Sequence, residues 1–116
     1  MRAYIPVSWA QLAAFHAAGS VDGPLRACVV DPVWRDAEPD VDEEQWEFEA
    51  QEAAAADLAD IDGGVVLALD VDAADLVPED GWVTLDGPVS RSDTAAVLTT
   101  DLAWFGVQEI AELLDR

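Results

Sequence analysis

The sequence predicts an α+β fold organised around one buried strand at residues 65–69. These five apolar residues follow Gly63 and Gly64 without interruption, and a continuous apolar run after turn residues is typical of a strand covered on both faces. Shorter apolar runs and two helical segments flank it. The chain of 116 residues is 52% hydrophobic, which suffices for one buried core. We therefore expect a single domain over residues 1–116, with a mixed, curved sheet of about five strands, two main helices and a short C-terminal helix.

The first strand and the first helix are predicted at the start of the chain. Residues 2–6 alternate weakly between apolar and polar side chains and end in proline, which favours a short strand. Ser8 and Gln11 have the spacing of a capping box, in which the side chain of each bonds the backbone N–H of the other. We therefore expect a helix over residues 9–18 that ends at Gly19.

A second strand and a long helix follow. Residues 25–30 predict the strand, and an acidic, proline-containing loop comes after it. Acidic residues with the spacing of a helix start indicate that the long helix begins near Asp40 or Asp42. Phe48 lies on its far face, where it either lies under a loop or marks a contact with a partner chain. The face toward the sheet is rich in alanine and consists of Trp46, Ala50, Ala53, Ala54, Asp57, Leu58 and Ile61.

The second half of the chain predicts shorter elements. Asp72 can cap a single helical turn over residues 72–76. Residues 82–85 alternate as a strand, and residues 95–100 predict the last strand, which we expect beside the central one. Apolar residues at helical spacing predict a short amphipathic helix over residues 107–114.

The charge of the chain limits its partners. It contains 25 acidic residues, five arginines and no lysine, for a formal net charge of −20. Such a surface repels nucleic acids and anionic membranes, and no apolar run approaches the ~20 residues that span a bilayer. We therefore expect a cytoplasmic protein that binds neither nucleic acid nor membrane. The acidity reflects either the composition of a GC-rich or salt-adapted host or the mimicry of a nucleic-acid backbone.

Few residues could carry catalysis or bind a metal. The chain has one histidine, His16 at a predicted helix end, and one cysteine, Cys28 in an apolar run. One of each is too few for a zinc site, and a Ser-His-Asp triad is not credible with this histidine. The acidic segment from Asp70 lacks the glycine and the glutamate that an EF-hand loop requires. We predict no catalytic residue, no metal and no cofactor.

The order of these elements resembles that of two protein groups. One is an uncharacterised family of small actinobacterial proteins that begin Met-Arg-x-Tyr-Ile/Val-Pro. The other, more distant, comprises small bacterial proteins with an ADP-ribosyltransferase-like fold. The matching stretches are residues 4–19, 65–76 and 87–98. The second resemblance implies a split, curved sheet around a cleft that binds NAD in the active members. Those members use a His or Arg on the first strand, a Tyr or Ser on a later strand and a Glu near the end of the sheet.

This chain departs from that pattern, because Ile5 and Pro6 stand about where the first-strand histidine would be and residues 82–100 contain no glutamate. We therefore expect a non-catalytic protein that binds a partner protein or a small ligand. The alternatives are a reduced NAD-using transferase and an acidic nucleic-acid mimic. Phe48 is the candidate contact for a partner. The candidate cleft lining combines cationic and aromatic side chains and consists of Arg2, Tyr4, Arg26, Trp34 and Arg35.

Overall fold

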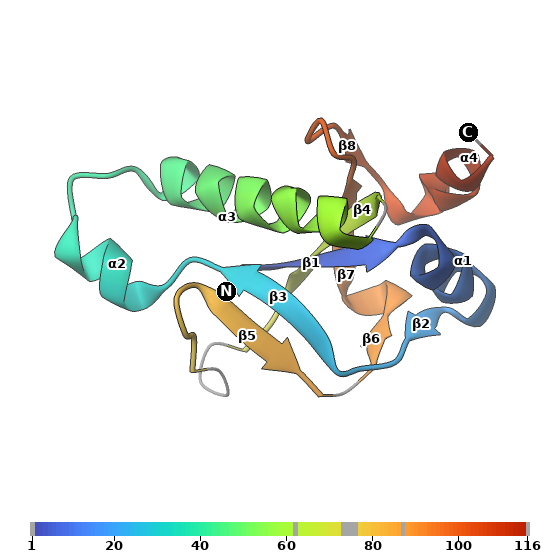
Figure 1. Ribbon diagram of the computed structural model, residues 1–116, viewed down its shortest axis with the longest axis horizontal. Helices are drawn as coiled ribbons and strands as arrows, with labels where there is room; N and C mark the ends of the chain where they lie inside the picture. The colour runs from blue at the N-terminus through green and yellow to red at the C-terminus, as the bar shows by residue number, and fades with distance from the viewer. Residues whose placement is uncertain (1, 62, 73–76, 87, 116) are drawn as a thin grey trace.

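A six-stranded sheet forms the centre of the computed structural model, which describes residues 2–61, 63–72, 77–86 and 88–115. The strand order is β5-β3-β1-β4-β7-β8, and β2 pairs with β6 in a separate two-stranded sheet (Figure 1). The strands of the main sheet are β1 (Arg2–Ser8), β3 (Leu25–Val29), β4 (Gly64–Asp70), β5 (Trp82–Leu85), β7 (Thr94–Leu98) and β8 (Trp104–Phe105). The small sheet consists of β2 (Ser20–Val21) and β6 (Val89–Ser90).

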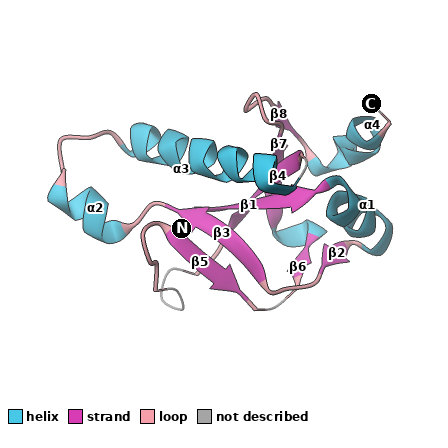
Figure 2. Cartoon of the chain, in the orientation of Figure 1, coloured by secondary structure: helices cyan, strands magenta, loops and turns pink. Residues whose placement is uncertain are grey.

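Helices cover both faces of the main sheet (Figure 2). The long helix α3 (Glu43–Asp57) packs on one face, whereas α1 (Trp9–Ala18) and α4 (Ile110–Leu114) contribute buried side chains to the core on the other. The remaining helical elements are α2 (Pro32–Ala37) and the 3-10 turns η1 (Leu58–Ile61), η3 (Arg91–Asp93) and η4 (Val107–Glu109). Within the described part of the chain, no helix combines the length and the apolar character needed to cross a bilayer.

The strand β4 lies in the middle of the sheet, between β1 and β7. Val65, Leu67 and Leu69 belong to the core shared with α1 and α4. Val66 and Ala68 belong to the core shared with α3. All five side chains are at most 4% exposed. The prediction of a central strand covered on both faces is therefore confirmed. The strand predicted over residues 95–100 lies beside it as β7, but it is not the last strand, because β8 follows and pairs with it.

The first helix also begins and ends at the predicted residues. The Ser8 hydroxyl accepts a hydrogen bond from the Gln11 backbone N–H at 3.1 Å, and the Gln11 side-chain oxygen accepts one from the Ser8 N–H at 2.8 Å. Gly19 ends the helix with a φ of +80°. The Arg91 guanidinium then donates to the backbone carbonyl of His16 at 2.6 Å, which ties η3 to the end of α1.

The α+β class is confirmed, but the sheet is not mixed, because each pairing among its described strands is antiparallel. The strands β3 and β4 run in the same direction and α3 joins them, a connection that commonly places two parallel strands side by side. Here β1 lies between the two and runs the opposite way. The result is a split β-α-β unit, in which the two parallel strands do not pair.

Shorter elements differ from the predictions for local reasons. The helix α2 falls in a segment that we expected to be a connection, although Asp31 and Pro32 carry a helix-start signal: the Asp31 carboxylate accepts from the Val33 N–H at 2.9 Å. The helix α3 begins after Asp42, one of its two predicted starts. The strands β2, β6 and β8 have two residues each and are too short to produce an alternating pattern. The turn predicted over residues 72–76 lies mostly outside the described residues.

Candidate functional site

Three tryptophans from different elements line one small cavity between α3 and the sheet. Trp34 comes from α2, Trp46 from α3 and Trp82 from β5, and the cavity has a volume of about 100 Å³. We name it the tryptophan pocket. Its other lining residues are Cys28, Val29, Val30, Glu49, Ala50, Ala53 and Asp80. Among the described residues the walls are therefore mostly apolar, and the exposed acidic residues Glu49 and Asp80 are the charged groups of the lining.

Backbone contacts at the end of the sheet position two of the rings. Trp82 lies directly opposite Cys28 in the pairing of β3 with β5. The Trp34 ring packs on the turn that precedes β5, since a Cβ atom on Gly81 would lie 3.0 Å from its Cζ3 atom. The carbonyl of Gly81 accepts a hydrogen bond from the Val29 N–H at 2.7 Å. The turn is therefore held by β3 and supports the ring from α2.

A larger hollow of about 590 Å³ lies next to the tryptophan pocket, along β5. The two are neighbours because Asp80 and Trp82 line both. The Arg26 guanidinium lies over the Trp82 ring, 4.2 Å from its centroid, and pairs with the Asp57 carboxylate at 3.5 Å. We name this cavity the β5 hollow. Its lining residues are Arg26, Val77, Glu79, Asp80, Trp82, Val83 and Thr84.

The thiol of Cys28 in the pocket wall is not a nucleophile at neutral pH. The residue is 5% exposed, and burial raises the pKa of its thiol to about 11. A protonated thiol neither attacks an electrophile nor binds a metal. Within the described residues, no group of three or more His, Cys, Asp or Glu side chains is arranged to hold a metal ion. The pocket is therefore equipped for binding by aromatic and charged groups.

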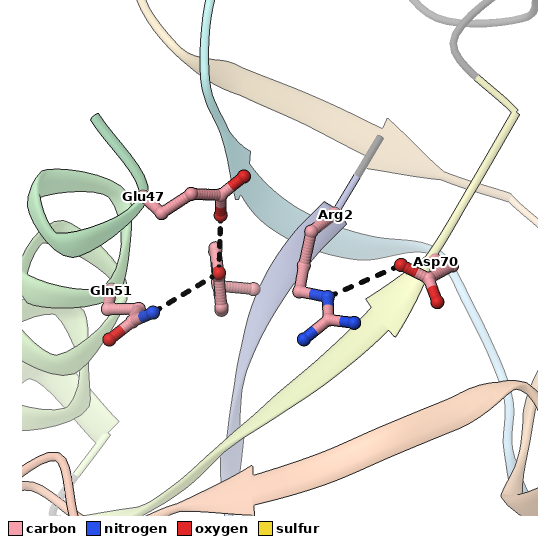
Figure 3. A network of polar contacts seen from close by, with 5 residues as sticks. Arg2, Glu47, Gln51 and Asp70 are labelled. Atoms are coloured by element: carbon pink, nitrogen blue, oxygen red, sulfur yellow. Dashed lines mark hydrogen bonds and ion pairs between the residues drawn. The ribbon is translucent and has the colours of Figure 1, made fainter. Parts of the chain in front are cut away.

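Tyr4 is one of the predicted lining residues, but its side chain fastens α3 to β1 and lines neither cavity. Its hydroxyl donates to the Glu47 carboxylate at 2.5 Å and accepts from the Gln51 amide at 3.2 Å (Figure 3). The residue is 1% exposed, and burial together with the bond to Glu47 raises the pKa of its hydroxyl far above its ordinary value. On the adjoining end of β1, Arg2 pairs with Asp70 at 3.3 Å (Figure 3).

The stability of the protein is expected to fall above pH 9 because of these two buried groups. The chain has one cysteine, one tyrosine and no lysine, so Cys28 and Tyr4 dominate its alkaline titration. Below about pH 8 both are protonated in the folded and the unfolded chain. Between pH 9 and 11 the unfolded chain loses the Cys28 proton and the folded chain keeps it. The free energy of unfolding then falls, by at most about 1.4 kcal/mol per pH unit.

Tyr4 extends this decrease above pH 10, because its pKa is raised as well. Urea denaturation at pH 8, 9.5 and 10.5 measures the effect. The variant Cys28→Ala should remove the decrease between pH 8 and 9.5 and keep the one above pH 10. A pH profile that is the same in both proteins would show that the buried thiol has no part in it.

The structure places two of the five predicted lining residues at the cavities, Trp34 at the tryptophan pocket and Arg26 at the β5 hollow. Arg35 instead pairs with Glu43 at 3.3 Å, across the connection between α2 and α3. Phe48 is 46% exposed on α3, in agreement with its predicted position on the far face of the helix. Of the five predicted lining residues, Trp34 and Arg26 therefore lie at two adjoining cavities, which share Asp80 and Trp82.

Sequence reasoning missed the other residues that line the tryptophan pocket, because their patterns are those of ordinary structural positions. Trp46 fits the helical stripe of α3 and Trp82 the alternation of β5, whereas the segment that holds Asp80 carries no pattern of a strand or helix. The indole N–H of Trp46 is the one buried side-chain polar group without a hydrogen-bond partner among the described residues. Five tryptophans in so short a chain are the signal that could have drawn attention to a shared aromatic site.

Comparison with known proteins places the chain in a family. A family model matches residues 1–101. The chain belongs to DUF6912, a family of unknown function. The predicted membership of an uncharacterised family is thus confirmed. No curated protein and no solved structure matches the chain. The lining residues of both cavities fall within the range matched by the DUF6912 model.

Proposed function

We propose that this DUF6912 protein is a non-catalytic binding protein whose tryptophan pocket receives a cationic group. The observation that supports this is the convergence of Trp34, Trp46 and Trp82 on one cavity that also has Glu49 and Asp80 in its lining. The face of an indole ring attracts cations through its quadrupole, by about 0.5–2 kcal/mol for each contact. The carboxylates of Glu49 and Asp80 also attract cations. The formal net charge of −20 raises the concentration of cations around the protein.

The volume of the pocket limits the size of the group that it holds. Cavities that enclose drug-sized ligands usually have volumes of about 300–1,000 Å³, whereas the tryptophan pocket has about 100 Å³. A water molecule occupies about 30 Å³ in the liquid, so the pocket takes a group of a few heavy atoms. A quaternary ammonium head or the end of a lysine or arginine side chain has this size.

The residues around the pocket favour binding over catalysis. Its thiol is protonated at neutral pH because burial raises the pKa of Cys28 to about 11. The hydroxyl of Tyr4 is buried beneath α3 and fully engaged with Glu47 and Gln51. His16 lies on α1, which packs against the opposite face of the sheet. The thiol, the phenol and the imidazole that the chain offers are therefore protonated, engaged or distant, and the carboxylates of Glu49 and Asp80 are the ionisable groups left in the pocket lining.

The two alternatives stay predictions with less support. A reduced NAD-using transferase of ADP-ribosyltransferase-like fold needs a site for a pyrophosphate. The β5 hollow is large enough, but Glu79 and Asp80 would repel that anion and Arg26 already pairs with Asp57. A nucleic-acid mimic would use the overall negative charge and would not need an aromatic cavity. A cytoplasmic location is compatible with each of these functions and also stays a prediction.

Choline and its neutral isostere 3,3-dimethyl-1-butanol test the proposed function. We expect choline, and not the isostere, to shift a subset of the tryptophan indole N–H signals in NMR titrations at millimolar concentration. The variant Trp34→Leu should lose the response. Trp104→Leu, which removes a comparably exposed ring from β8, should keep it, because Trp34 and Trp104 are 42% and 50% exposed and only Trp34 lines the pocket. Equal binding of the isostere, or of both variants, would contradict the proposal.

A further inference from the structure

We propose that the cation is carried by a basic segment of a partner polypeptide, which places one cationic side chain in the tryptophan pocket and a second in the β5 hollow. This inference rests on the proposed function, since it assumes that the tryptophan pocket binds a cation. It adds the chemical class of the binding partner, and it adds the β5 hollow as a second site that binds a cationic side chain next to the tryptophan pocket.

The arrangement of the two cavities suggests a single extended occupant. Asp80 and Trp82 belong to both linings, so the cavities adjoin along β5. In an extended chain, side chains two residues apart lie on the same side, about 6.6 Å apart along the strand. Two cationic residues at this spacing can enter adjacent cavities on either side of one shared wall. The volume of about 590 Å³ of the β5 hollow leaves room for a side chain and part of the backbone that carries it.

The charges of the lining favour a cation at the second position. Glu79 and Asp80 are both exposed acidic residues of the β5 hollow. Among the described lining residues the one cation, Arg26, pairs with the Asp57 carboxylate at 3.5 Å and lies on the Trp82 ring. Arg26 itself shows that this ring accepts a guanidinium on its face. The hollow therefore keeps an excess of negative charge after its own arginine is paired.

A polypeptide fits these features better than a free organic cation. A peptide spans two cavities, whereas a quaternary ammonium compound fills only the smaller one. Nucleic acids and anionic membranes are disfavoured as partners, because the formal net charge of −20 repels them. The charge complementarity therefore points to a basic protein segment.

Three capped peptides test the inference: Ala-Lys-Ala-Lys-Ala, the same peptide with one lysine replaced by alanine, and the same peptide with both lysines replaced by norleucine. We expect the two-lysine peptide to bind about three- to tenfold more tightly than the one-lysine peptide in calorimetric titrations at low salt. The norleucine peptide should not bind measurably. Choline is titrated alongside as the probe of the tryptophan pocket alone.

Charge-matched variants then locate the second lysine. Glu79 lines only the β5 hollow, Glu49 lines only the tryptophan pocket, and Glu112 lies exposed on α4 and lines neither. Glu79→Gln should abolish the advantage of the two-lysine peptide and leave choline binding unchanged. Glu49→Gln should weaken choline and both lysine peptides. Glu112→Gln removes the same charge and should change none of these affinities.

The outcomes separate the two proposals. If choline binds but the second lysine brings no gain, or if Glu79→Gln and Glu112→Gln reduce peptide binding equally, the partner inference is wrong and the proposed function stands. If neither choline nor any lysine peptide binds, or if the norleucine peptide binds as well as the others, both are wrong.

Discussion

Replacing Gly64 with alanine is expected to lower the free energy of unfolding by more than about 4 kcal/mol, a large share of the 5–15 kcal/mol of a typical domain. Gly64 opens β4 and pairs with Ser8 of β1. Its φ is +150°, and a Cβ atom would lie 1.9 Å from the Val7 carbonyl oxygen. That oxygen belongs to the backbone of the neighbouring central strand, so the contact can be relieved only by moving β1 away from β4.

Gly19→Ala is the matched control for this prediction. Gly19 also has a positive φ of +80°, but no atom beyond its two chain neighbours lies within 4 Å of the Cβ position. The substitution therefore introduces only backbone strain, of about 1–2 kcal/mol. Urea denaturation of both variants measures the difference. A comparable loss of stability in the two proteins would show that the close approach of β1 to β4 contributes nothing beyond the dihedral angle.

Trp46→Ala is expected to lower the free energy of unfolding by about 3–5 kcal/mol, as truncations of buried tryptophan typically do. Trp46 is 8% exposed and packs in the core between α3 and the sheet. The variant Trp46→Phe should cost far less, below about 1.5 kcal/mol. Phenylalanine keeps most of the apolar contacts and removes the unpaired indole N–H, whose burial costs about 1–3 kcal/mol in the native protein.

The same pair of variants separates stability from binding. Trp46→Phe keeps an aromatic face in the tryptophan pocket and should retain choline binding, weakened by no more than a few-fold because phenylalanine attracts cations less than tryptophan. Denaturation and choline titration of the two variants are the measurements. If phenylalanine costs as much stability as alanine, the indole N–H is not a penalty in the folded protein and must be satisfied there.

The elements that could be predicted from the sequence are those that local chemistry determines. The helix α1 begins at the capping box of Ser8 and Gln11 and ends at Gly19. Both signals lie in or next to the helix itself, so its bounds could be predicted. The strand β4 can be predicted from its own residues alone, because a strand that is buried on both faces is apolar at every position. The direction of the strands was beyond this reasoning, since the insertion of β1 between β3 and β4 is decided by tertiary packing.

The tryptophan pocket depends on contacts between distant parts of the chain. Its rings come from positions 34, 46 and 82, and each satisfies the pattern of its own element without reference to the others. Tyr4 shows the reverse case, in which a residue singled out from the sequence has its polar group engaged inside the fold. Its hydroxyl suggested a polar cleft residue, but Glu47 and Gln51, more than 40 positions away, satisfy that hydroxyl in the interior. A polar group on a strand can therefore mark either a binding site or an internal clamp.

The place of β1 between β3 and β4 has a consequence for synthesis of the chain. The strand β1 leaves the ribosome before the two strands that flank it, and the second of these, β4, ends only at Asp70. Until then the nascent chain carries an apolar strand with a free edge, and such edges pair readily with other chains. Protection by a chaperone would matter most during this interval, and a product truncated before Gly64 would remain prone to aggregation.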